Sequence, residues 1–400
     1  MKQYAAMLLA ALALAGCQEK LTAPADCPTL CPGGQPQIFD EVFTAITGAD
    51  SSYSGYVQPH QARSSLVSNG LEGFEERALV RFLTRADSVS VRDTLRGYTI
   101  DSVALSFTVA ARDTSVNGLE LWVYRIAPGF DSTSTFADVA PAFVPESLIA
   151  AIPIPDTANT GVVRTVFQGA DLSRVQISPA DSGRLAVGVR LSAPVFTGIR
   201  LGAVAAGAAG AVFTTYATLD VPDTGTAKLR TLALSTAFNT YVSEVPQVSD
   251  TTLLAVGGAP SSRSLLRFSL PPRILDSATI VRATLELTPI APISGLPTDA
   301  VVLEARSVLA DVGGKSPVNT LPGRVPADTL ELGSSAVSIE AVRLVELWLG
   351  ANRPSALVLA LNPEGASFTK PVFYSSRAAD PALRPRLRLS YLLSFPFETP

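Results

Sequence analysis

The stretch Ser102-Val103-Ala104-Leu105-Ser106-Phe107-Thr108-Val109 carries a large apolar side chain at every second position. Two later stretches, Ala283-Thr284-Leu285-Glu286-Leu287-Thr288 and Arg386-Leu387-Arg388-Leu389-Ser390-Tyr391, alternate in the same way. A period of two is typical of a β-strand that buries one face and exposes the other. Segments rich in Pro, Gly, Asp, Ser and Thr separate these runs. The sequence therefore predicts an all-β fold, an antiparallel β-sandwich of the jelly-roll kind.

The chain also repeats itself at low identity. Matched stretches follow one another in the same order in the two halves: Tyr56-Val57 and Tyr241-Val242, Arg77–Phe82 and Arg263–Phe268, Ser102–Val109 and Val281–Thr288, Leu119–Ile126 and Val301–Arg306, Leu185–Leu191 and Ala356–Leu361, and the closing Tyr216 and Tyr391. An ordered series of this kind indicates a duplicated domain. We therefore expect two tandem β-sandwich domains, residues 37–220 and 233–395, joined by a linker of residues 221–232 that is rich in Pro, Gly, Asp and Thr.

One segment of the second half departs from the strand pattern. Ser338 to Leu349 carries apolar residues at a spacing closer to that of a helix, and Gly350 is placed to end it. Its counterpart in the first half, Asp171 to Ile177, is shorter. We expect one short helix or helical turn in each domain, packed across an end of the sandwich.

The N-terminus carries an export signal. Lys2 precedes an apolar run from Ala5 to Ala15, which is too short to span a bilayer and has the length of a signal-peptide core. The run ends in Leu14-Ala15-Gly16-Cys17, which resembles the bacterial lipobox. This resemblance implies that residues 1–16 are a lipoprotein signal peptide and that Cys17 is acylated. The alternative is an ordinary secretory signal in which the cysteine occurs by chance.

Residues 17–36 are polar and rich in proline, as expected of a tether behind an acylated cysteine. Gln18 stands where enterobacterial lipoproteins of the inner membrane carry Asp. The resemblance therefore implies the outer membrane or cell surface, with the acyl chains as the contact to the membrane. In an oxidising compartment we expect Cys27 and Cys31 to form a local disulfide; free thiols are the alternative. A metal site there would need two further ligands that the sequence does not offer nearby.

The composition excludes several classes of function. The 400 residues are 47% hydrophobic and 16% charged, with a net charge of −4, and so lack the basic character of a nucleic-acid binder. A single histidine, His60, and three cysteines offer little for a catalytic metal or a redox cluster. No complete catalytic motif is present, although a pair of carboxylates of the glycosidase kind stays open. We predict a protein that is not an enzyme and holds no metal or other cofactor.

A candidate binding surface lies in the stretch Leu119–Ile126. The alternation places Glu120, Trp122 and Tyr124 on the face opposite the leucines. If the leucine face is the core, the two aromatic rings form a flat platform beside a carboxylate, which suits a sugar ring. The alternative is that both faces are covered, with Trp122 in a second apolar layer or in the contact between the domains.

Four stretches of the second half follow the pattern of a known family: Leu265–Phe268, Ala283–Leu287, Phe373-Tyr374-Ser375-Ser376-Arg377 and Arg384–Tyr391. In these stretches the second half resembles the DNRLRE domain, which is grouped with a family of carbohydrate-binding modules that includes alginate binders. Ala378 stands where the family pattern has an acid. The resemblance implies a jelly-roll sandwich carried on bacterial surface proteins, with sugar binding known for some members.

Arg377 closes one of these stretches, and its planar guanidinium fits a carboxylate. The partner is either an acidic sugar or an Asp or Glu of its own domain. Taken together, the sequence predicts a non-catalytic, surface-anchored lipoprotein that acts in binding or adhesion at the cell envelope, with polysaccharide as a candidate ligand. The alternative is a structural or assembly component of the envelope that binds a partner protein.

Overall fold

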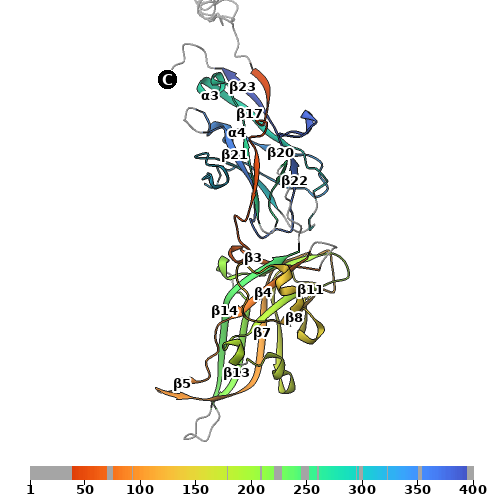
Figure 1. Cartoon of the computed structure of the whole chain (residues 1–400), viewed down its shortest axis with the longest axis vertical. Coiled ribbons are helices and arrows are strands. Elements are labelled where there is room, and N and C mark those ends of the chain that lie inside the picture. The colour runs from red at the N-terminus through yellow and green to blue at the C-terminus, as the bar shows by residue number, and fades with distance from the viewer. Residues whose placement is uncertain are drawn as a thin grey trace, which may run out of the picture.

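The computed structural model of the protein describes residues 38–69, 75–91, 93–177, 179–207, 210–219, 228–244, 252–258, 261–293, 295–296, 301–321, 323–349 and 354–393. The described part is mostly β-strand and forms two sandwiches placed end to end (Figure 1), which confirms the all-β prediction. Every strand pair among the described residues of both sandwiches is antiparallel. The signal peptide, Cys17, Cys27, Cys31 and the tether lie outside the described residues.

The first sandwich is one long sheet, ordered β3-β12-β7-β13-β14-β4-β11-β8-β9, that folds over onto itself. Strand β14 makes the fold-over, because its first half pairs with β13 and its second half pairs with β4, with a bulge between Thr236 and Phe238. Its strands are β3 (Ser64–Ser68), β4 (Glu76–Phe82), β7 (Tyr98–Arg112), β8 (Glu120–Arg125), β9 (Leu148–Pro153), β10 (Gly161–Gln168), β11 (Ala186–Ser192), β12 (Gly198–Gly202), β13 (Val212–Leu219) and β14 (Lys228–Ser243), with the hairpin β5 (Val89–Val91) and β6 (Thr94–Arg96).

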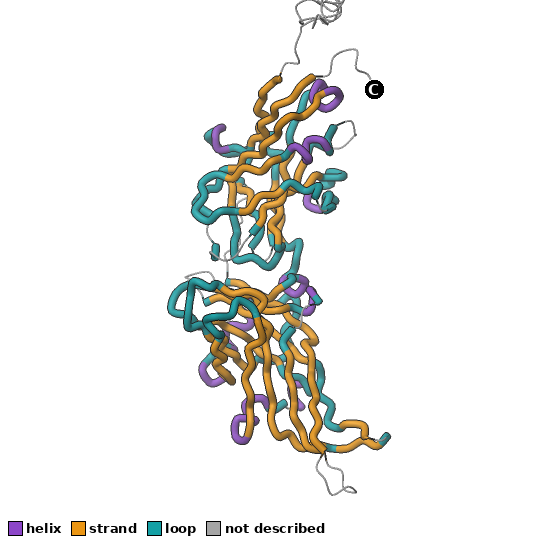
Figure 2. Tube along the Cα trace, turned by 180° about the vertical axis from the view of Figure 1, so that it is seen from behind, coloured by secondary structure: helices purple, strands orange, loops and turns teal. Residues whose placement is uncertain are grey.

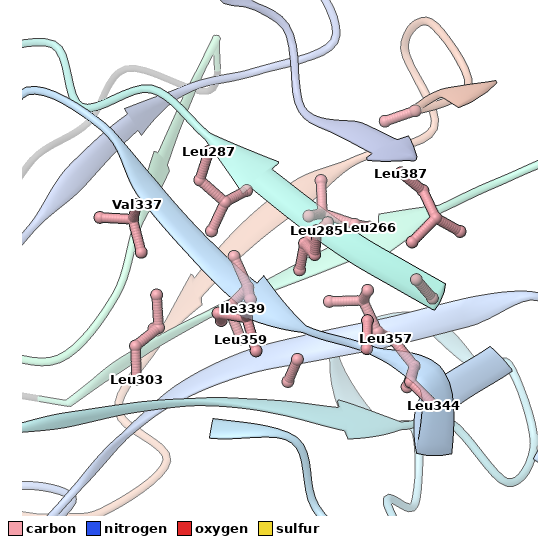
Figure 3. Close-up of a cluster of buried hydrophobic side chains, with 14 of the residues drawn as sticks. Leu266, Leu285, Leu287, Leu303, Val337, Ile339, Leu344, Leu357, Leu359 and Leu387 are labelled. Atoms are coloured by element: carbon pink, nitrogen blue, oxygen red, sulfur yellow. The ribbon is translucent and has the colours of Figure 1, made fainter. Parts of the chain in front are cut away.

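The second sandwich packs the sheet β1-β23-β17-β20 against the sheet β19-β18-β21-β16-β2. Leucines at alternate positions of both sheets interlock between them (Figure 3), and the buried Trp348 belongs to the same core. Its strands are β1 (Ile38–Thr44), β2 (Ser51–Ser54), β15 (Leu253–Ala255), β16 (Ser262–Arg267), β17 (Ala278–Leu287), β18 (Val302–Ser307), β19 (Ala327–Thr329), β20 (Val337–Glu340), β21 (Ala356–Asn362), β22 (Val372–Tyr374) and β23 (Arg386–Leu393).

The helical segments are short and lie at the periphery of the strands (Figure 2). They are η2 (Pro59–Gln61), α2 (Phe136–Val139), η3 (Ala140–Ala142), η4 (Pro145–Ser147), η5 (Gly169–Val175), η6 (Pro179–Asp181), η7 (Val204–Ala206), α3 (Pro272–Ser277), η8 (Gly313–Lys315), α4 (Val342–Glu346) and η9 (Pro381–Leu383). Among the described residues, no helix is long and apolar enough to cross a membrane.

The predicted helix of the second half is shorter than expected. Residues 337–340 form strand β20, because Val337 and Ile339 point into the core while the residues between them face outward. The helix α4 begins only at Val342 and packs Leu344 and Val345 into the same core. In the first half, the expected helical turn is present as η5.

The two repeats exchange strands. In the first sandwich, β14 pairs with β13 and β4. In the second sandwich, β1 pairs with β23 and β2 pairs with β16, which are the repeat equivalents of β13 and β4. The segment β1–β2 therefore corresponds to β14, and each repeat gives its opening segment to the sandwich of the other (β1, in red, lies beside β23, in blue, in Figure 1).

This exchange corrects the domain boundaries expected from the sequence. The repeats at 37–220 and 233–395 are not the folding units, because residues 38–54 complete the second sandwich and residues 228–243 complete the first. The predicted linker is likewise displaced: residues 228–232 are part of strand β14, and residues 221–227 lie outside the described part of the chain.

A small apolar cluster joins the sandwiches. Leu66 and Tyr241 of the first sandwich meet Leu296 and Phe368 of the second, and all four are buried. The hydroxyl of Tyr241 donates a hydrogen bond of 2.6 Å to the carbonyl of Gly365. The chain segment that leads from β2 to β3 passes beside this cluster, and it forms one side of the site described next.

Candidate functional site

The aromatic platform expected on β8 does not form. Tyr124 is only 4% exposed and lies under the ring of Phe143, at 5.0 Å between ring centroids. Trp122 is half-buried, and its indole N–H donates a hydrogen bond of 3.0 Å to the carboxylate of Glu120. One buried ring and one half-buried ring leave no flat surface for a sugar.

The reason is a cover over this face of the first sandwich. The connection between β8 and β9 folds back across the sheet and forms a second apolar layer with it, which includes Phe130, Val139 and Phe143. The guanidinium of Arg77 lies 4.5 Å from the ring centroids of both Phe136 and Phe143 and extends the cover. The cover buries Tyr124, in line with the alternative interpretation of the sequence, while Trp122 stays half-buried.

Arg377 pairs within its own sandwich. Its Nη1 lies 3.2 Å from the carboxylate of Asp50, and its Nη2 donates a hydrogen bond of 3.0 Å to the carbonyl of Gly48. The buried Asp50 also accepts hydrogen bonds from the backbone N–H and the hydroxyl of Ser376, at 2.6 and 2.9 Å. The guanidinium thus fastens the turn between β1 and β2 to the rest of the second sandwich. Of the two partners considered for Arg377, an acidic sugar or a carboxylate of the protein, the structure has the carboxylate.

We expect Arg377→Ala to lower the free energy of unfolding of the second sandwich by about 1–2 kcal/mol, because a buried carboxylate loses a charged hydrogen-bond donor. Denaturant unfolding measures this loss. The matched control is Arg343→Ala, which removes an exposed pair with Glu346 and should cost less than about 0.5 kcal/mol. Equal stability of Arg377→Ala and the unchanged protein would contradict the structural role.

The equivalent face of the second sandwich is covered only in part, since Leu265 and Val358 are buried there in a small apolar cluster, whereas Glu304 and Arg306 line a hollow. A hollow of about 590 Å³ lies over the outer face of β18 and β21, beside the segment that leads to the first sandwich. This volume is within the range of small-ligand sites. It is lined by Val57, Gln61, Arg63, Glu304, Arg306, Thr320, Leu321, Gly323, Val325, Asn362, Pro363 and Glu364, and we call it the cleft.

An ion-pair network forms the floor of the cleft. The guanidinium of Arg306 lies 2.7 Å from the carboxylate of Glu304 and 3.5 Å from that of Glu364. Glu364 also receives two hydrogen bonds from Arg263, at 2.6 and 2.9 Å. The side-chain amide of Asn362 donates a hydrogen bond of 2.9 Å to Glu304. The polar groups are thus held in place before any ligand arrives.

The cleft offers fixed hydrogen-bond donors and acceptors. Carboxylate oxygens accept, whereas guanidinium and amide N–H groups donate, so the floor presents both kinds at close range. Arg63 stands exposed at the side of the cleft and makes no ion pair with any residue that the structure describes. Such a surface can bind a neutral or charged molecule that carries many hydroxyl groups.

Within the described ranges, no group of three or more His, Cys, Asp or Glu side chains is placed to hold a metal ion. The ring of His60 stacks on that of Phe238, at 5.9 Å between centroids. The two carboxylates of the cleft are engaged by arginines, which suits a role in binding.

The sequence held a signal for this site. Glu304 and Arg306 on β18 are the repeat equivalents of Trp122 and Tyr124 on β8. The alternation therefore pointed to the right positions of the strand, but the cleft uses them in the second repeat and the prediction named them in the first. The side of the cleft formed by Val57, Gln61 and Arg63 gave no signal, because it lies some 240 residues away in the sequence from β18.

Comparisons with known proteins give no family assignment. No family model matches the chain, and no curated protein matches it. A Clostridium perfringens structure, described as the M60 catalytic domain with the CBM51-1 and CBM51-2 domains of ZmpB, is similar over 90% of this chain and 42% of that chain, with 8% identity and a TM-score of 0.14. This chain therefore spans less than half of that protein. A TM-score this low carries no argument, and the resemblance to the DNRLRE domain stays a prediction.

Proposed function

We propose that this protein is a non-catalytic binding protein of the cell envelope and that the cleft of the second sandwich binds a saccharide. One observation carries the proposal: Glu304, Arg306, Asn362 and Glu364 form a prearranged set of donors and acceptors on the floor of a hollow of about 590 Å³. A saccharide presents hydroxyl groups that both donate and accept, so it can use both halves of this set.

Prearrangement favours binding for a physical reason. Holding a long side chain in one rotamer costs about 0.5–1.5 kcal/mol of entropy on binding. Here the ion pairs with Arg263 and Arg306 already hold both carboxylates, so a ligand meets groups that need little ordering. The side chains of Glu304, Arg306 and Glu364 are 12–15% exposed, so they still present polar atoms to the hollow.

The proposal includes the anchor predicted from the lipobox. Acylation of Cys17 would attach the chain to the outer membrane or cell surface, and residues 18–37 would link that anchor to β1. Because β1 and β2 belong to the second sandwich, the anchor would lead directly into the sandwich that carries the cleft.

The test uses residues 18–400 with Glu304→Gln and Asn362→Ala variants against immobilised linear glucans, mannans, xylans and uronic-acid polymers. We expect saturable binding to one polymer class, weakened about 10- to 100-fold by Glu304→Gln, since a charged hydrogen bond contributes about 1.5–3 kcal/mol. Asn362→Ala removes a donor at the edge of the network and should weaken binding less, with the melting temperature unchanged.

The matched control is Trp122→Ala, at the repeat equivalent of Glu304 in the covered face of the first sandwich. We expect it to bind like the unchanged protein. Binding lost in Trp122→Ala and kept in both cleft variants would place the site on β8 and overturn the cleft. An absence of binding across the panel would contradict saccharide binding itself and favour a role in assembly with a partner protein.

A further inference from the structure

A second hollow lies beside the cleft. It has a volume of about 480 Å³ and is lined by Tyr53, Ser54, Gly55, Tyr56, Val312, Gly314 and Lys315. The two hollows are lined by neighbouring parts of the same two chain segments. Tyr56 lines the second hollow and Val57, the next residue, lines the cleft; in the other segment, Lys315 lines the second hollow and Thr320 lines the cleft.

Both hollows lie over the sheet β18-β21-β16-β2, since Glu304 and Asn362 of β18 and β21 line the cleft and Tyr53 of β2 lines the second hollow. The register pairs Tyr53 with Arg263, Ser264 with Leu359, and Ala360 with Glu304, so a row across the four strands leads from Tyr53 to Glu304. Neighbouring strands lie about 4.8 Å apart, so the row from β2 to β18 spans about 14 Å. That length exceeds a single sugar ring.

Arg263 connects the two hollows. Its guanidinium lies 4.3 Å from the ring centroid of Tyr56, which lines the second hollow, and donates two hydrogen bonds to Glu364, which lines the cleft. A cation stacked on an aromatic face and paired with a carboxylate is fixed in position. Arg263 therefore links the residues that line the two hollows and is itself held in one position.

The second hollow has the chemistry that a sugar ring needs. The ring of Tyr53 packs directly on Gly314, where a Cβ atom would lie 2.6 Å from Cδ1 of the ring. Lys315 is exposed and makes no ion pair with the described part of the chain. An aromatic surface beside a free hydrogen-bond donor complements the apolar face and the hydroxyl groups of a pyranose.

We propose that the two hollows form one groove that binds an internal segment of a linear polysaccharide, with one sugar at Tyr53 and another over Glu304 and Asn362. This inference rests on the proposed function, since it names the form of the ligand that the cleft takes. Two neighbouring hollows over one sheet suit an extended chain that lies across the strands.

The test measures affinity for size-graded oligosaccharides, from two to ten sugars, prepared from whichever linear glucan, mannan, xylan or uronic-acid polymer binds. We expect affinity to rise with length until both hollows are filled, and then to level off. Tyr53→Ala should lower the affinity for the longer oligosaccharides about two- to tenfold and leave that for the shortest unchanged, since an aromatic contact contributes about 0.5–1.5 kcal/mol.

Two further variants guard against a folding defect in Tyr53→Ala. Lys315→Ala removes an exposed side chain of the second hollow, and Gly314→Ala pushes the Tyr53 ring out of place. Both should weaken only the longer oligosaccharides. The control Leu309→Ala lies in the same loop, outside both hollows, and should bind normally.

The outcomes separate the inference from the function on which it rests. An affinity that is independent of length, with no effect of Tyr53→Ala or Lys315→Ala, would overturn the groove and leave saccharide binding in the cleft. Equal loss of affinity for all lengths in Tyr53→Ala and Lys315→Ala would also overturn it, because the second hollow would then not be a separate part of the site. If no polymer binds, the proposed function fails and the groove fails with it.

Discussion

Removal of residues 38–58 is expected to unfold the second sandwich and to leave the first one folded. The deletion takes away β1 and β2, which form an edge of each sheet of the second sandwich. The first sandwich keeps its complete set of strands, because β14 supplies the equivalent positions there. Thermal unfolding of residues 59–400 should therefore show one cooperative transition in place of two.

The size of the effect follows from what β1 and the next turn bury. Phe39 and Phe43 pack against the core, Ala45 lies within it, and Asp50 is fully buried against Ser376. Each large apolar side chain contributes about 1.5–3 kcal/mol when fully buried, and the hydrogen bonds to β23 add about 1 kcal/mol each. The sum is about 5 kcal/mol or more, which is comparable to the whole stability of a typical domain.

A peptide of residues 38–58 added in trans should restore the second transition, since the lost strands are edge strands that pair without threading the chain. The control is the same peptide with Phe39→Ser and Phe43→Ser, which keeps the backbone pairing but loses the apolar contacts. Two unchanged transitions in residues 59–400 without the peptide would contradict the strand exchange.

The sequence predicted the strands and the duplication but not this exchange. Alternation at 102–109, 283–288 and 386–391 reports which face of a strand is buried, and those strands are present as β7, β17 and β23. Which partner a strand takes depends on contacts between residues far apart in the chain. Tyr56-Val57 and Tyr241-Val242 matched correctly as repeat positions, yet the strands before them belong to opposite sandwiches.

The candidate site was predicted in part, for the same physical reason. Alternation correctly placed the side chains of Glu120 and Trp122 away from the core, but it carries no information on what covers that face. The cover is a loop that contains Phe136 and Phe143, and no periodicity marks a loop as a cover. In the second repeat the apolar cover reaches Leu265 and Val358 only, and the charged residues Glu304 and Arg306 line a cleft beside it.

The second large effect is a loss of stability of the first sandwich as the pH rises from about 4.5 to about 7. Its source is Glu76 on β4, which is 1% exposed and accepts hydrogen bonds from the hydroxyls of Ser68 and Ser243, at 2.5 and 3.4 Å. The nearby Arg77 and Arg190 pair with Glu75 instead, at 2.7 and 2.9 Å. Burial without a cation raises the pKa of Glu76 to about 7.

The direction follows from proton binding. Between the ordinary carboxyl pKa of 4.5 and the raised value of about 7, the folded state keeps a proton that the unfolded state has released. The contribution of Glu76 to the stability of the first sandwich is therefore complete below about pH 4.5, falls between about pH 4.5 and pH 7, and changes no further above that. At about 1.4 kcal/mol for each unit of pKa difference, the loss is about 3 kcal/mol.

Glu76→Gln should remove this pH dependence and stabilise the first sandwich at pH 8 by up to about 3 kcal/mol, because the amide stays neutral while it can still bond with Ser68 and Ser243. Denaturant unfolding at pH 5 and pH 8 measures both changes, with Glu331→Gln, exposed on the second sandwich, as the control that should alter neither. The comparison isolates the charge, since in the folded state the carboxyl and the amide are both neutral at pH 5, and the two proteins should differ much less in stability there than at pH 8. A slope between pH 5 and pH 8 that persists in Glu76→Gln would show that another group of the first sandwich causes it.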